Sequence, residues 1–187
     1  MSQNLARPAN TAGSESILWH NLQLMQKRTA LAYGQQLLKQ MPPDSEFFRL
    51  VHRFYCDSFE DVCVLCKELH RIVCEPIDIG LLNSRIDPAN AETSNKQGLR
   101  QIKRVALWLD ALKLDGRKVT QALAGVADLR QGDAHAKSSK LRESLKIFGI
   151  PPDCTAYQPM CCEIIGQVAN SVGAISDAVT VPSKSTN

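Results

Sequence analysis

The sequence predicts an all-α protein, an antiparallel helical bundle of five or more helices, and three observations lead to this class. Apolar residues recur at steps of three and four along several stretches, and no stretch keeps the two-residue alternation of a strand. Prolines and glycines fall between these stretches, where helices are expected to end. Aromatic residues make up only 5% of the 187 residues, which favours an aliphatic helical core. A chain of this length is sufficient for one domain with a sizeable core.

The first half of the chain is expected to form three helices, over Ser14–Met41, Glu46–Asp57 and Phe59–Glu75. A capping serine begins the first, and the stretch "MPPDS" ends it because proline cannot continue the backbone hydrogen bonds. Asp44 or Ser45 can cap the second helix, and Asp57 or Ser58 can cap the third. Pro76 ends the third helix.

The second half begins with a polar loop over residues 83–98, which has no apolar periodicity. Helices are then expected around Ile102–Leu112, over Val119–Arg130, over Lys140–Phe148 and over Tyr157–Val179. Gly149 stands where a helix-ending glycine belongs. We expect the following residues in the core: Leu65, Leu69, Val105, Leu109, Leu123 and Val126. Residues 15–180 therefore form one expected helical domain, between a disordered lead at 1–14 and a disordered tail at 181–187.

Seven cysteines raise the question of a metal site or disulfides: Cys56, Cys63, Cys66, Cys74, Cys154, Cys161 and Cys162. Cys63, Cys66, His70 and Cys74 have ligand-like spacing, but all four lie in one predicted helix. Side chains on a single helix project along a stripe and do not surround a metal ion tetrahedrally. We therefore expect reduced, mostly buried cysteines and no metal cofactor, with a metal-binding regulator as the last of three readings.

Charge is distributed unevenly along a chain whose net charge is +3. The segment Arg100–Lys146 carries eleven Lys and Arg residues against five acids, so it is +6 and the remainder is −3. A basic half suits a polyanionic partner such as RNA, although a solvated lysine-rich helix surface has the same composition. No apolar run approaches the roughly 20 residues that span a bilayer, so we expect a cytoplasmic protein without a membrane segment.

The stretch "LRQGDAH" within this basic half places Arg130 and His135 five positions apart, between two predicted helices. Gly132 permits a close turn, Asp133 can hold one tautomer of His135, and a serine follows that can begin the next helix. The alternative is an ordinary loop with a glycine and a salt-bridged arginine. Spacing alone leaves both interpretations open.

The same stretch resembles the Arg-polar-x3-His signature of the HEPN superfamily, whose members are helical bundles and are often dimeric. Arg130 matches the motif arginine, Gln131 the polar residue after it, and His135 the motif histidine. The motif covers about seven residues, and a HEPN-like core would span about residues 46–150. Many members are metal-independent endoribonucleases that act in defence, toxin–antitoxin systems or RNA processing.

The resemblance implies a role for each residue of the site. Arg130 would bind the scissile phosphate, and His135 would move the proton, with Gln131 and Asp133 in support. The RNA backbone would be guided by Lys137, Lys140 and Arg142. A homodimer would complete the site. The alternative function is a non-catalytic helical module that binds a partner protein, such as an antitoxin or defence component, or RNA.

Overall fold

The computed structural model describes residues 13–51, 56–86, 100–131 and 139–179, and these residues form a bundle of packed helices. The described residues contain no strand, only one isolated antiparallel bridge between Leu38 and Ile77. The all-α prediction is therefore confirmed.

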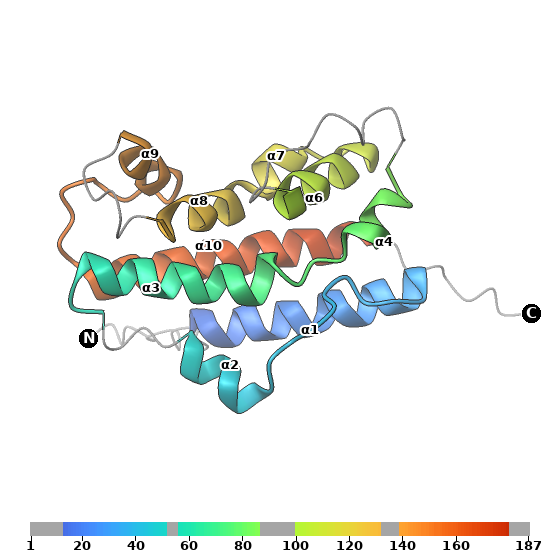
Figure 1. The fold of residues 1–187 in the computed structure, drawn as a ribbon, viewed down its shortest axis with the longest axis horizontal. Helices are drawn as coiled ribbons and strands as arrows, with labels where there is room; N and C mark the ends of the chain where they lie inside the picture. Colours follow the sequence, from blue (N-terminus) through green and yellow to red (C-terminus); the bar gives the residue numbers. More distant parts are fainter. Residues whose placement is uncertain (1–12, 52–55, 87–99, 132–138, 180–187) are drawn as a thin grey trace, which may run out of the picture.

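Helices of unequal length follow one another along the chain (Figure 1). They are α1 (Ser14–Tyr33), α2 (Asp44–Leu50), α3 (Phe59–Leu69) with the π-helical turn η1 (His70–Cys74), α4 (Ile79–Asn83), α6 (Arg100–Ala111), α7 (Gly116–Val119), α8 (Gln121–Leu129), α9 (Ser139–Ile147) and α10 (Tyr157–Ala178). The long α10 lies at the centre, where it contacts α1, α3, α7 and α8. In Figure 1, α6 to α9 form a layer on one side of α10, and α1 runs along its other side.

The core consists mainly of aliphatic side chains from these helices, as the sequence predicts. All six expected core residues are buried, and Val105, Leu109 and Leu69 have no exposed surface. Polar contacts reinforce the α1–α10 interface, because Asn21 donates to the carbonyl of Ala169 and Arg28 pairs with Asp177. This interface holds the two longest helices of the described chain together.

The first predicted helix is too long. It ends at Tyr33 because Gly34 adopts the left-handed conformation, with φ of 76°, and its amide bonds the carbonyl of Ala30. Beyond it, Leu38 is in extended backbone: the buried Gln26 side chain accepts from the Leu38 amide and donates to its carbonyl, both at 2.8 Å. The expected serine cap is also wrong, since Gly13 occupies the N-cap position without a side-chain hydrogen bond.

The second predicted helix is displaced and the third is correct in extent. Helix α2 begins at Asp44 with Pro43 as its N-cap and ends at Leu50, while residues 52–55 lie outside the described part of the chain. Ser58 caps α3 as expected: its hydroxyl accepts from the Asp61 amide, and the Asp61 carboxylate accepts from the Ser58 amide at 2.9 Å. The end of this helix widens into η1, which the sequence pattern does not indicate.

In the second half of the chain, one predicted helix and the predicted polar loop differ from the structure. The helix expected over Val119–Arg130 is interrupted at Thr120, where the backbone φ is −91°, so α7 and α8 are separate. Helix α4 includes Asn83, so the polar loop begins later than expected, and residues 87–99 lie outside the described chain. Gly149 does follow a helix end with φ of 67°, as predicted. The predicted disordered ends fall almost wholly on residues that are not described.

No helix in the described ranges combines the length and the apolarity needed to cross a membrane.

Candidate functional site at the end of helix α8

Arg130 occupies the C-terminal end of α8, where a buried helix reaches the protein surface. Its amide donates to the carbonyl of Val126 at 3.0 Å, which fixes its backbone as the cap of the helix. Val126 and Leu129, its neighbours on α8, are buried in the core. The Arg130 side chain itself is 23% exposed, so its charge sits at a boundary between core and solvent.

The Arg130 guanidinium contacts two residues from a different part of the sequence. Its Nη1 lies 2.6 Å from Nδ1 of His70 and 3.5 Å from Oε1 of Glu75. His70 begins η1 and Glu75 follows its last residue, and η1 packs against α8. The structure therefore pairs the motif arginine with a histidine 60 positions earlier in the chain.

The π-helical turn is what brings His70 and Glu75 to the same side. A regular α-helix advances about 100° per residue, so residues five apart would project about 140° apart. In η1 the Glu75 amide instead donates to the His70 carbonyl at 3.1 Å, an i to i+5 bond that closes a wider turn. Oε1 of Glu75 then lies 3.2 Å from Nδ1 of His70. Such turns occur frequently at functional sites.

The hydrogen bonds of the cluster depend on the tautomer of His70. Arginine has donors only, so its 2.6 Å contact is a hydrogen bond in the neutral tautomer that carries its proton on Nε2 and accepts at Nδ1. A proton on Nδ1 would instead be donated to the Glu75 carboxylate at 3.2 Å. Burial lowers the pKa of His70 from its ordinary value and the Arg130 charge lowers it further, while Glu75 opposes both effects. The Glu75 carboxylate contacts both groups, with Oε1 at 3.2 Å from Nδ1 of His70 and at 3.5 Å from Nη1 of Arg130.

Cys74 lies inside the same turn and is not a reactive thiol. Burial raises its pKa to about 12, although the nearby Arg130 charge acts in the opposite direction. A thiol with this pKa stays protonated at neutral pH and is a poor nucleophile. Its part in the cluster is packing.

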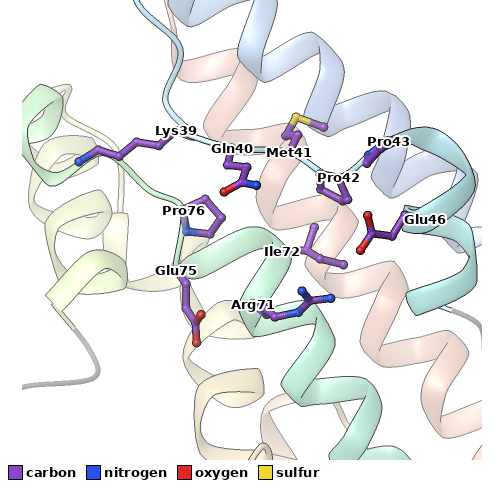
Figure 2. Close-up of a pocket in the computed structure, with 10 residues that line it drawn as sticks. All are labelled: Lys39, Gln40, Met41, Pro42, Pro43, Glu46, Arg71, Ile72, Glu75 and Pro76. Carbon is purple, nitrogen blue, oxygen red and sulfur yellow. The ribbon is translucent and has the colours of Figure 1, made fainter.

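A groove of about 380 Å³ adjoins the cluster and shares Glu75 with it. Figure 2 shows Lys39 from the segment between α1 and α2, Glu46 from α2, and Arg71 from η1 among its lining residues. Both cations already have acidic partners: Arg71 pairs with Glu68 at 2.7 Å, and Lys39 lies 3.7 Å from Asp78. The groove is therefore of mixed charge and has no basic excess that would attract a polyanion.

The structure describes only part of the predicted site. Gln131 is exposed and directly follows Arg130, with its amide bonded to the carbonyl of Asp128 at 3.2 Å. Arg142 is exposed on α9. The remaining predicted residues lie outside the described chain: Asp133, His135, Lys137 and the side chain of Lys140. The joint action of Arg130 and His135 at one site stays a prediction.

The predicted burial of the cysteines is confirmed. Five are buried and two are partly exposed, and all seven are free thiols. Across the described ranges, no three His, Cys, Asp or Glu side chains gather in a way that could hold a metal ion. His70, the imidazole of the ligand-like Cys63–Cys74 series, directs Nδ1 to Arg130.

Sequence reasoning missed His70 and Glu75 as members of the cluster. His70 has no motif around it, so the sequence indicates only a structural or surface histidine. It is buried, at 5% exposure, but its partner is an arginine on another helix. The i, i+5 spacing of His70 and Glu75 gives no signal in a helix assumed to be α-helical throughout.

A comparison of the chain with protein-family models, curated proteins and solved structures finds no match in any of the three.

Proposed function

We propose that this protein is a HEPN-like, metal-independent endoribonuclease that cleaves RNA at an Arg130–His135 site, completed by a second copy of the chain. The proposal rests on the motif in the sequence together with one structural observation. Nη1 of Arg130, at the C-terminal end of α8, lies 2.6 Å from Nδ1 of His70.

A held cation is what phosphate chemistry needs from an arginine. The stabilisation that the cation gives to the transition state depends on a position set in advance, because the side chain then does not have to reorient during the reaction. His70 and Glu75 both contact Nη1 of Arg130, so these two contacts do not use Nη2 or Nε. Two parallel N–H groups of a guanidinium can bind two phosphate oxygens.

In the proposed reaction, the 2′-OH of RNA attacks the adjacent phosphate while Arg130 stabilises the developing negative charge. His135 moves the proton between the 2′-OH and the leaving oxygen, since its ordinary pKa suits proton transfer near neutrality. Gln131 and Asp133 support this pair. The RNA backbone is guided by Lys137, Lys140 and Arg142. The bond broken is the P–O5′ bond, so the products carry 2′,3′-cyclic phosphate and 5′-OH ends.

One observation favours the second candidate, a non-catalytic helical interaction module. Glu75 already offers Arg130 a carboxylate at 3.5 Å, which is the arrangement of a structural arginine. This carboxylate is 53% exposed, however, so solvent screens its attraction for the arginine. An anionic ligand can therefore compete for the guanidinium.

The test is cleavage of a broad RNA pool by the purified protein in the presence of EDTA. We expect cleavage by the wild type with cyclic phosphate ends, no cleavage by His135→Ala, and weakened binding and cleavage by Arg130→Ala. Matched controls are His20→Ala and Arg49→Ala, since both residues are exposed and lie on α1 and α2, away from the motif. A wild-type protein that leaves every RNA uncut, or a His135→Ala variant that still cleaves, contradicts the proposal.

A further inference from the structure

We propose that His70 is a positioning residue, which holds the Arg130 guanidinium through Nδ1 in the orientation that meets an RNA phosphate. This inference rests on the proposed function, and it adds to the site a residue that the sequence motif does not contain. Its basis is the 2.6 Å contact between Nη1 of Arg130 and Nδ1 of His70 across the α8–η1 interface.

Burial separates a positioning role from a catalytic one. The His70 side chain is 6% exposed and its Nδ1 is occupied by Arg130, so the ring does not reach a substrate in the solvent. A general base must lie within hydrogen-bond reach of the proton that it removes. His70 therefore acts through Arg130.

A neutral histidine holds an arginine in a way that a carboxylate does not. A carboxylate at the same place would fix the guanidinium but also cancel its charge, and with it the attraction for a phosphate. The imidazole accepts one hydrogen bond and carries no charge, so this contact does not offset the positive charge of Arg130. The long arginine side chain also loses rotamer freedom before the ligand arrives, which lowers the entropy cost of binding.

The two contacts of Arg130 differ in a way that supports this assignment. The nitrogen of the buried His70 ring is 2.6 Å from Nη1, whereas the oxygen of the half-exposed Glu75 is 3.5 Å away. The nearer and more buried partner determines where the guanidinium lies. Glu75 has a looser contact that a phosphate can replace.

The arrangement depends on the protonation of one ring. A proton on Nδ1 would direct N–H against the donor of Arg130, so the hydrogen bond would be lost. In the doubly protonated ring, two cations would also face each other. Among the described residues, the charged groups that act on His70 are Arg130 from α8 and Glu75 at the end of its own turn. Burial and Arg130 lower the pKa of His70, so the neutral form persists at neutral pH.

Two variants of His70 separate positioning from packing. His70→Asn keeps an acceptor, because the amide oxygen of asparagine can take the place of Nδ1, whereas His70→Phe fills similar volume without an acceptor. Two measurements are made on each variant at neutral pH: the Kd for an uncleavable 2′-O-methyl RNA oligomer, and kcat/KM for a cleavable RNA. NMR of the histidine ring nitrogens in the wild type reports the tautomer directly and needs no variant.

We expect His70→Phe to weaken the oligomer Kd and to lower kcat/KM by about tenfold each, as loss of one hydrogen bond to a charged group implies, with His70→Asn within about threefold of wild type. NMR should show Nδ1 unprotonated. If the wild type and the two variants bind the oligomer with these relative affinities but the wild type cleaves no RNA, the nuclease proposal is contradicted and His70 remains a positioning residue. Cleavage that is equal in wild type and His70→Phe, equal losses in both variants, or a proton on Nδ1 overturns the inference.

Discussion

Replacement of glycine by alanine is expected to have opposite effects on stability at two positions, because the added methyl group would contact different atoms. At Gly116, the first residue of α7, an added Cβ would lie 2.0 Å from the carbonyl oxygen of Ala106 on α6. At Gly166, inside α10, the nearest atom would be Oγ of Ser14 at 3.7 Å, which is an ordinary contact. Gly116→Ala should therefore destabilise the protein, and Gly166→Ala should stabilise it.

The magnitude for Gly116→Ala comes from the movement that it forces. The atom in the way is backbone, so α6 and α7 must separate until 2.0 Å becomes at least 3.4 Å. Overpacking of this kind costs roughly 1–3 kcal/mol and sometimes more. The separation also strains the hydrogen bond of 2.8 Å from the Gly116 amide to the Asp110 carboxylate, worth about 1 kcal/mol. The lower entropy of the unfolded alanine chain returns about 0.5–1 kcal/mol, so a net loss of about 1–3 kcal/mol is expected.

Gly166→Ala keeps the favourable part of this change without the clash. Alanine in a helix interior is favoured over glycine by about 1 kcal/mol, and nothing within contact distance opposes it. Urea unfolding followed by the helical circular dichroism signal gives both free energies. A Gly116→Ala variant within about 1 kcal/mol of wild type, or a Gly166→Ala variant less stable than wild type, would refute the reasoning from close approach.

Three further predictions follow from buried groups. Stability should fall as the pH drops through 6.5, the ordinary pKa of His70, because the unfolded chain then binds a proton that the folded chain, with its lowered pKa, does not. One such proton changes the free energy of unfolding by at most about 1.4 kcal/mol per pH unit. Unfolding of the wild type and of His70→Asn at about pH 7.5 and about pH 5.5 isolates the contribution of His70. The same pH dependence in both proteins speaks against the lowered pKa. Leu109→Ala removes a side chain with no exposed surface and should cost roughly 2–5 kcal/mol in urea unfolding, and a loss below 1 kcal/mol would be inconsistent with its burial. Thr29→Val keeps the shape but leaves the Leu37 amide without its 3.1 Å acceptor, so a loss of about 1–3 kcal/mol is expected in thermal or urea unfolding, and no change would mean that another acceptor is found.

The fold class and most of the core follow from the sequence because they depend on local periodicity. Leu109 and Val105 stand on one stripe of an amphipathic helix, and both are buried as that stripe predicts. Capping depends on three or four neighbouring residues, so the sequence also indicates Ser58 as one of two possible caps of α3, and the structure confirms it. Features of this kind need no knowledge of distant parts of the chain.

The helix ends and the site depend on contacts that a local pattern does not encode. Leu37 and Leu38 have helical spacing, yet Gly34 ends α1 and the side chain of Gln26 captures the backbone of Leu38. His70 belongs with Arg130 only because η1 packs against α8. Its identity as a site residue is a property of the tertiary structure.

The turn η1 contains one residue more than a regular α-helix needs to place His70 and Glu75 on one face. A deletion of one residue between them would let the segment relax into regular α-helix with its backbone hydrogen bonds intact. The ring and the carboxylate would then stand four positions apart, about 40° around the helix, and would still share a face. A chain of the present length that kept a regular α-helix here would instead turn Glu75 about 140° away from His70. The pair is therefore compatible with the loss of one residue in this segment, but not with the loss of the π-helical turn alone.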